Sequence, residues 1–154
     1  MKITQRTATL NDAAILLNWR NDKSTRKFSR QSEEISPDEH IEWLIARLKR
    51  VRAEPFYLFD SEFGAIGMCR LDAISGSASK YEISILVEPS QHGKGIGTRI
   101  LSLTCESFFE LYPNYAIVAY IDGENYVSQK LFLSAGFKLM PSLGKLLHFE
   151  KTLN

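Results

Sequence analysis

The chain has 154 residues, of which 44% are hydrophobic and 24% charged, and its formal net charge is +1. This size and composition are those of one soluble globular domain, expected to span residues 1–154. The net charge near zero argues against a general basic surface for nucleic acid. No stretch reaches the roughly 20 apolar residues of a membrane span, and the two cysteines and three histidines do not have the spacing of metal ligands.

The N-terminal residues predict a short strand and a helix. Residues 3–6 begin the sheet, and because residues 1–6 lack the apolar core of a signal peptide, we expect a cytoplasmic location. Residues 9–12 are typical of a helix start. The buried stripe of this helix is expected to contain Ala13, Ile15, Leu16 and Trp19.

A second helix is predicted after a loop over residues 21–35. Ser36 supplies an N-cap, Pro37 suits the first helical position, and Glu39 completes a capping box. The side chains expected to face inward are Ile41, Leu44, Ile45 and Leu48, and Trp43 is interpreted as a core residue. A basic run at the helix end, Arg47, Lys49, Arg50 and Arg52, indicates a solvated face that suits the carbonyl end of the helix dipole.

The rest of the chain is rich in predicted strands. They cover residues 56–59, 65–71, 81–87, 115–121 and 146–151, with a helix beginning at Ile96. This order predicts an α/β fold of the α+β type, with a mixed, mostly antiparallel sheet and helices on both faces. Cys69 and Cys105 fall on a strand and a helix, and we expect buried, reduced thiols.

Residues 91–98 (Gln-His-Gly-Lys-Gly-Ile-Gly-Thr) place three glycines at alternate positions between a strand and a helix. Without a Cβ at Gly93, Gly95 or Gly97, the chain can turn tightly and a ligand can approach the main chain. The amides of this turn and of the first helical turn converge on one spot of partial positive charge, and Lys94 adds a cation. The pattern predicts a pyrophosphate-binding loop rather than an ordinary turn.

Two common nucleotide-binding loops do not fit this pattern. A Walker A loop is excluded because Lys94 is followed by Gly95 and not by Ser or Thr. A Rossmann loop needs Gly-x-Gly-x-x-Gly after a first strand, whereas here the spacing is Gly-x-Gly-x-Gly and the loop lies past mid-chain. Nucleotide hydrolysis and hydride transfer are therefore disfavoured.

A second block follows at residues 125–137, where Asn125 suits an N-cap and Gly136 a left-handed C-terminal cap. With residues 92–97 it resembles the GNAT superfamily of acetyl-CoA-dependent N-acetyltransferases. The family's loop reads Gln/Arg-x-x-Gly-x-Gly/Ala, and its helix reads Asn-x-x-Ala/Ser-x-x-Leu-Tyr-x-x-x-Gly-Phe. His92 stands where the family usually has Arg or Gln.

The resemblance implies acetyl-CoA as co-substrate and no metal. In the family, the strands corresponding to residues 82–87 and 115–121 splay apart and admit the pantetheine arm like an added strand. One backbone amide there would polarise the thioester carbonyl. The residues expected to bind the cofactor are Ile85, Leu86, Val87, His92, Gly93, Lys94, Gly95, Ile96, Gly97, Thr98, Asn125, Ser128 and Lys130.

Glu82 is the candidate general base, because some family members place a catalytic Glu in this strand. Strand alternation puts it on the face shared by Ser84 and Leu86, although a surface glutamate remains the alternative. The family's thiolate-protonating Tyr is replaced by Phe132. Tyr126 and Tyr120 could substitute, and a buried structural tyrosine is the alternative for each.

Acceptor binding is expected in the N-terminal third, through Trp19, Arg20, Arg26 and Arg30. Arginines offer planar donors to a diphosphate, and aromatic rings offer stacking surfaces. Core packing of Trp19 and pairing of Arg20 with Asp22 or Glu39 are the alternatives. The sequence here is similar to GNAT branches that acetylate nucleotide-linked 4-amino sugars, of the pseudaminic acid biosynthesis type, and to branches that acetylate ribosomal-protein N-termini.

The sequence thus predicts transfer of acetyl to a primary amine by direct attack. The first candidate acceptor is a UDP-linked 4-amino-4,6-dideoxy sugar, and a ribosomal-protein N-terminus or another small amine is the second. A non-catalytic acyl-CoA-binding module is the alternative of another class, which Phe132 makes conceivable. The expected partners are small molecules, with neither nucleic acid nor membrane, and a homodimer is one expectation for the assembly.

Overall fold

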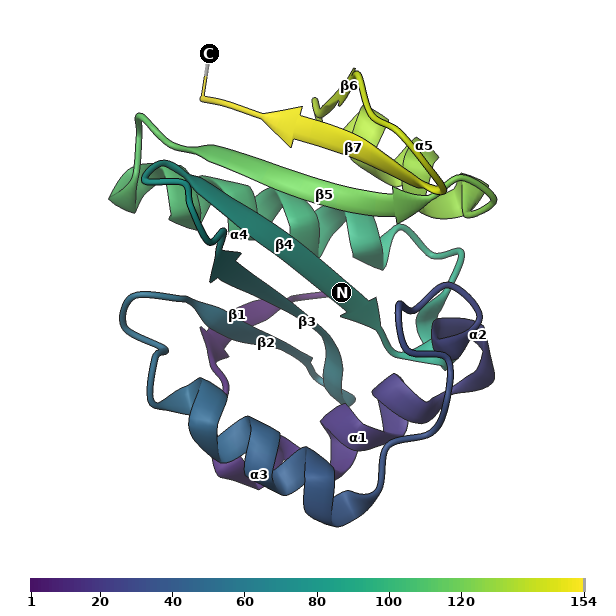
Figure 1. Cartoon of the computed structure of the whole chain (residues 1–154). Coiled ribbons are helices and arrows are strands. Elements are labelled where there is room, and N and C mark those ends of the chain that lie inside the picture. Colours follow the sequence, from purple (N-terminus) through teal and green to yellow (C-terminus); the bar gives the residue numbers. More distant parts are fainter. Residues whose placement is uncertain (154) are drawn as a thin grey trace.

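The computed structural model describes residues 1–153 and places seven strands in one sheet of order β1-β2-β3-β4-β5-β7-β6 (Figure 1). The strands are β1 (Thr4–Thr7), β2 (Phe56–Ser61), β3 (Gly64–Ala73), β4 (Lys80–Val87), β5 (Ala116–Asp122), β6 (Lys138–Met140) and β7 (Leu146–Lys151). Only β4 and β5 pair in parallel within this sheet. The predicted mixed, mostly antiparallel sheet is therefore confirmed.

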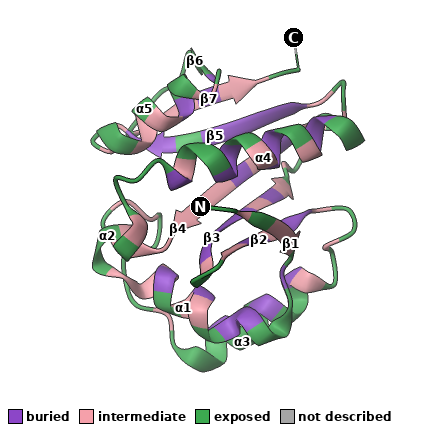
Figure 2. Cartoon of the chain, turned by 180° about the vertical axis from the view of Figure 1, so that it is seen from behind, coloured by how far each residue is buried: buried purple, intermediate pink, exposed green. Residues whose placement is uncertain are grey.

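Helices cover both faces of the sheet, as predicted. They are η1 (Leu10–Asp12), α1 (Ala13–Asn21), α2 (Lys23–Arg26), α3 (Pro37–Leu48), η2 (Pro89–Gln91), α4 (Ile96–Leu111) and α5 (Tyr126–Ser134). Helix α4 lies behind β4 and β5 in Figure 1 and in front of them in Figure 2, while α1 and α3 lie together beside β2 and β3. The short α2 lies inside the segment predicted as a loop. No helix within residues 1–153 is long and apolar enough to cross a membrane.

Each face of the sheet has its own apolar core. One cluster joins α4 and α5 to the sheet and contains Ile83 and Ile100, whereas the other joins α1 and α3 to the sheet and contains Leu44 and Met68. Leu86 packs against the second cluster. Because side chains alternate along a strand, Glu82 shares the face of Leu86, which is the face that α1 and α3 cover.

Strands β4 and β5 separate after a short ladder. They pair only from Lys80–Glu82 to Ala116–Val118, and their far ends lie wide apart (Figure 1). The carbonyl of Lys80 accepts from Ile74 and the amide of Glu88 donates to Ile66, so even-numbered residues of β4 turn their backbone groups to β3. The backbone groups of Ile83, Ile85 and Val87 therefore face the opening between β4 and β5.

The N-terminal helices follow part of the prediction. Ala13, Leu16 and Trp19 are buried in α1, and the Ser36 hydroxyl caps α3 by accepting from the Glu39 amide at 3.2 Å. The predicted inward face of α3 is wrong in part, because Ile41 and Ile45 are exposed. The residues that α3 buries are His40, Leu44 and Arg47, and Trp43 is 40% exposed beneath the guanidinium of Arg70.

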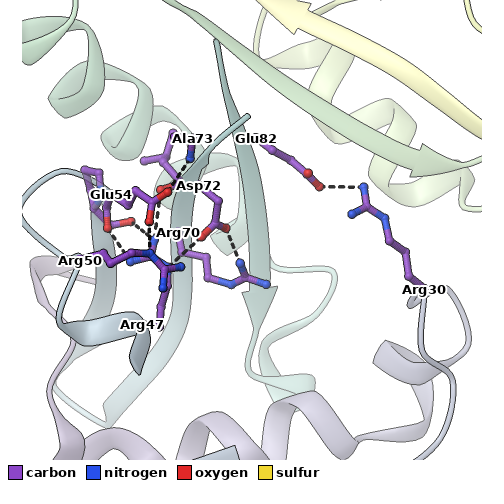
Figure 3. A network of polar contacts seen from close by, with 10 residues as sticks. Arg30, Arg47, Arg50, Glu54, Arg70, Asp72, Ala73 and Glu82 are labelled. Carbon is purple, nitrogen blue, oxygen red and sulfur yellow. Dashed lines mark hydrogen bonds and ion pairs between the residues drawn. The ribbon is translucent and has the colours of Figure 1, made fainter. Parts of the chain in front are cut away.

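The interpretation of the basic run as a solvated face is wrong for Arg47, because its side chain is 1% exposed. Its guanidinium donates to the carboxylate of Asp72 at 2.8 Å and to the carbonyls of Glu54, Pro55 and Leu71 (Figure 3). Burial lowers the pKa of Arg47, and Asp72 opposes that shift. The side chain thus joins the end of α3 to β2 and β3, because it satisfies backbone carbonyls that water does not reach.

An Arg47→Ala variant is expected to lose about 1–3 kcal/mol of unfolding free energy, because the carbonyls of Glu54 and Leu71 lose their Arg47 donor, while Asp72 keeps Arg70 and the Pro55 carbonyl keeps the Leu71 amide. Urea denaturation at equilibrium measures this loss. Arg50→Ala is the matched control, because Arg50 is half exposed and pairs with Glu54, and it should lose less than about 1 kcal/mol. Equal losses in the two variants would contradict the role of Arg47.

Candidate active site

The glycine loop opens α4 with a backbone suited to an anion. Gly93 and Gly95 have φ of 78° and 76°, a region that favours glycine, and no atom lies within 4 Å of where their Cβ atoms would stand. The first hydrogen bond of α4 runs from the Arg99 amide to the Gly95 carbonyl. The amides of Ile96, Gly97 and Thr98 therefore have no partner within the helix.

The charges around this helix terminus are favourable to a phosphate. The first turn of α4 contains no acidic residue, while His92, Lys94 and Arg99 are exposed around it. Both the helix dipole and these side chains favour negative charge there. Arg99 was not singled out from the sequence, and its place one turn after the Gly95 cap is the signal that could have found it.

Gly97 joins the three segments predicted to bind the cofactor. A Cβ there would stand 3.7 Å from Val87 Cγ2 on β4 and 3.4 Å from Leu131 Cδ2 on α5. The glycine loop, the end of β4 and α5 therefore meet beside the β4–β5 opening. Leu86 differs from the prediction, because its backbone groups turn to β3 in the antiparallel ladder.

His92, which departs from the family pattern, is tied to the end of β4. Its Nε2 atom lies 3.0 Å from the carbonyl oxygen of Val87. This contact closes the turn between β4 and α4 across the η2 segment. The imidazole therefore holds the glycine loop in register with the strand that borders the opening.

Helix α5 has the predicted caps at both ends. The side-chain oxygen of Asn125 accepts from the Ser128 amide at 3.2 Å, and Gly136 has φ of 91°. Lys130 is exposed on this helix. Cofactor contacts by Asn125, Ser128 and Lys130 stay predictions, since the observed role of the first two is to cap the helix.

Glu82 lies at the point where β4 and β5 part. It is the last β4 residue of the parallel ladder, paired with Val118, and its side chain is 26% exposed. Arg30, from the segment between α2 and α3, donates from Nη2 to Glu82 Oε2 at 3.0 Å (Figure 3). The Arg30 guanidinium also lies over the ring of Tyr120 on β5, 5.5 Å from its centroid. The structure thus joins the predicted base to a predicted acceptor-binding arginine.

The other predicted acceptor residues have structural contacts. Trp19 is 1% exposed and donates from Nε1 to Glu88 at 2.6 Å, so it has no free ring face and the predicted stacking role is wrong. Arg20 donates to the Gln31 carbonyl at 2.7 Å, and Arg26 donates to the carbonyls of Asn21 and Ser32. Both arginines hold the segment that carries Arg30.

Phe132 is buried and makes an edge contact with Phe137 at a centroid distance of 4.9 Å. The structural alternative for the two tyrosines is wrong, because Tyr126 is 72% exposed and Tyr120 is 37% exposed. Tyr120 lies on the same face of the sheet as Glu82, and both contact the Arg30 guanidinium; the sequence suggested Tyr120 only as a substitute acid.

The cysteines and the metal-binding residue types offer no competing chemistry within residues 1–153. Cys69 and Cys105 are buried free thiols, and burial raises their pKa values to about 12 and about 11. Neither is therefore a ready thiolate nucleophile. No group of three or more His, Cys, Asp and Glu side chains in this part of the chain could hold a metal ion.

The chain is similar to known acetyltransferases. The family model described as acetyltransferase (GNAT) domain matches residues 2–138. A protein of Bacillus subtilis (strain 168), provisionally named phosphinothricin acetyltransferase YwnH, is 24% identical over 131 residues, which are 80% of this chain and 76% of that protein.

Two solved structures share the fold over almost the whole chain. The spermidine N-acetyltransferase of Vibrio cholerae, in complex with CoA and spermine, has a TM-score of 0.83 at 19% identity, with 97% of this chain and 94% of that chain covered. The ribosomal-protein-alanine N-acetyltransferase of Brucella melitensis has a TM-score of 0.81 at 23% identity, with 97% and 99% covered. At sequence identities this low, the structural similarity establishes a common fold and nothing more specific.

Proposed function

The chain belongs to the acetyltransferase (GNAT) domain family, and we propose that it transfers acetyl from acetyl-CoA to a primary amine by direct attack at the β4–β5 opening. The observation that carries this proposal is the three-residue ladder between β4 and β5, which ends at Glu82 beside the glycine loop. A strand-like arm can enter only where the neighbouring strands leave backbone groups unpaired. The Ile83 carbonyl, both backbone groups of Ile85 and the Val87 amide are placed for that contact, whereas the Val87 carbonyl already lies 3.0 Å from His92 Nε2.

Different residues around the opening bind the cofactor, stabilise the thioester oxygen and take the proton. The glycine loop and the first turn of α4 hold the diphosphate of coenzyme A, and an amide of Ile85 or Val87 stabilises the charge that grows on the thioester oxygen. Glu82 takes a proton from the acceptor's ammonium group, directly or through one water, and the neutral amine then attacks the thioester carbonyl. With Phe132 buried, the thiolate of coenzyme A leaves without a proton from that position.

The acceptor that we propose is a small cationic amine. The two neighbours with the same fold act, by their names, on spermidine and on a ribosomal-protein alanine, and both acceptors carry an ammonium group. A carboxylate beside an aromatic ring, as in Glu82 and Tyr120, suits such a cation.

A nucleotide-linked 4-amino sugar is the second candidate acceptor. The observation that favours it is Arg20, whose Nη1 atom is buried and has no hydrogen-bond partner among the described residues. A phosphate oxygen would satisfy that donor. A single domain over residues 1–154, a cytoplasmic location and a homodimer stay predictions.

Release of free thiol from acetyl-CoA tests the proposed function. The purified protein is given spermidine, an alanine-terminated ribosomal peptide, phosphinothricin and a UDP-linked 4-amino sugar in separate reactions. Turnover with the polyamine supports a cationic acceptor, and turnover with the UDP-sugar alone supports the second candidate. Tight acetyl-CoA binding without turnover on any amine would favour a non-catalytic binding module.

A further inference from the structure

Arg30 fills a cation site made from two separate strands. Glu82 of β4 provides a carboxylate oxygen 3.0 Å from the guanidinium, and Tyr120 of β5 provides a ring whose centroid lies 5.5 Å away. A carboxylate and an aromatic face are the two groups that best attract an organic cation. Both lie where β4 and β5 part, at the place where the acceptor amine must meet the thioester.

The segment that carries Arg30 is fixed to the protein on both sides of it. Asn21 and Ile35 exchange two hydrogen bonds of 2.9 Å across the ends of the segment. Arg20 donates to the carbonyl of Gln31 at 2.7 Å, and Arg26 contacts Ser32. The backbone around residue 30 is thus held over the opening, and the Arg30 side chain reaches inward from it (Figure 3).

The Arg30 side chain itself is weakly held. It is 62% exposed, and among residues 1–153 its guanidinium donates one side-chain hydrogen bond, to Glu82. A guanidinium has five N–H donors, so most of its donors remain available to water. Such an exposed pair contributes little stability, and a competing cation can displace it.

We propose that Arg30 is an internal substitute for the acceptor, occupying the ammonium subsite formed by Glu82 and Tyr120 until the substrate amine displaces it. This inference deepens the proposed function, because it names the acceptor as a cation and identifies the two groups that bind it. Displacement also frees the Glu82 carboxylate to receive the ammonium proton. Arg30 therefore raises the KM for every cationic acceptor, and it pairs with the Glu82 carboxylate when no acceptor is bound.

Kinetics of an Arg30→Ala variant test this proposal on the amine found to turn over. The KM for the amine is expected to fall about three- to tenfold, with the Kd for acetyl-CoA unchanged. Lys27→Ala is the matched control, because it removes the same charge from the same segment while Lys27 contacts Phe28. A raised KM would instead make Arg30 a ligand for an acceptor anion, and a lowered kcat would make it a positioning residue for Glu82; either result overturns the proposal.

Binding of methylguanidinium tests the subsite without any turnover, so that a failure here differs from a failure of the proposed function. Amide signals of Glu82 and Tyr120 are followed by NMR during titration. Saturation is expected at a concentration about three- to tenfold lower in Arg30→Ala than in the wild type. Adding Glu82→Gln to Arg30→Ala should abolish the response. Identical curves for the wild type and Arg30→Ala would refute an occupied subsite.

Discussion

A Gly95→Glu variant is expected to lose measurable acetyl-CoA binding. The new carboxylate would stand at the N-terminus of α4, in the open space where the diphosphate is proposed to lie. Loss of one or two hydrogen bonds to a charged group would cost about 3 kcal/mol, which raises the Kd by about 100-fold or more. Isothermal titration calorimetry with acetyl-CoA measures the change.

Two control variants separate charge at the glycine loop from backbone strain. Gly95→Gln has the same size and the same unfavourable φ of 76°, so it should weaken binding less than Gly95→Glu. Gly144→Glu places the same charge and comparable strain at φ of 88° in open space on an exposed turn, and it should bind acetyl-CoA normally. Normal affinity of Gly95→Glu would remove the glycine loop from the cofactor site.

The parts of the site that the sequence predicts well depend on local geometry. A glycine with positive φ, a serine cap and a left-handed helix end each follow from a few adjacent residues, and Gly95, Ser36 and Gly136 all behave as expected. The strand-to-helix order around residues 91–98 is local in the same sense. The helix ends and the backbone conformation of the glycine loop could therefore be predicted before any tertiary contact was known.

Residues whose environment depends on distant segments were predicted less well. Arg47 follows His40 and Leu44 at helical spacing, but a pattern of hydrophobic residues does not count an arginine as buried, and the carbonyls of Glu54, Pro55 and Leu71 that bind it come from distant segments. The exposure of Trp43, which the sequence placed in the core, has the same origin. Hydrophobic patterns rank a residue by its type, whereas burial is decided by what packs against it.

The Arg30–Glu82 pair belongs to this second class. The two residues are 52 positions apart, and the sequence pointed to them by separate arguments, one as a donor to an acceptor anion and the other as a base. Their contact changes the role that we assign to Arg30 and shows what neutralises Glu82 in the free protein. An arginine that neutralises the proposed base in the absence of substrate competes with the acceptor rather than binding it.

A Glu82→Gln variant is expected to keep acetyl-CoA affinity and to lose about 10²- to 10⁴-fold in kcat, the range for loss of a general base. The amide has nearly the same shape as the carboxylate and can still accept from Arg30, but it cannot take the ammonium proton. Steady-state kinetics with the amine found in the screen give kcat, and calorimetry gives the Kd for acetyl-CoA.

Glu150→Gln controls for the loss of a carboxylate on the same face of the sheet. Glu150 pairs with Lys80 at 3.0 Å and lies across β5 from Glu82, so its neutralisation should leave kcat near the wild-type value. The Arg30→Ala background separates proton transfer from the ion pair, because Glu82→Gln should lower kcat there by the same factor. If kcat of Glu82→Gln equals that of the wild type, or falls only while Arg30 is present, Glu82 holds Arg30 and another group takes the proton.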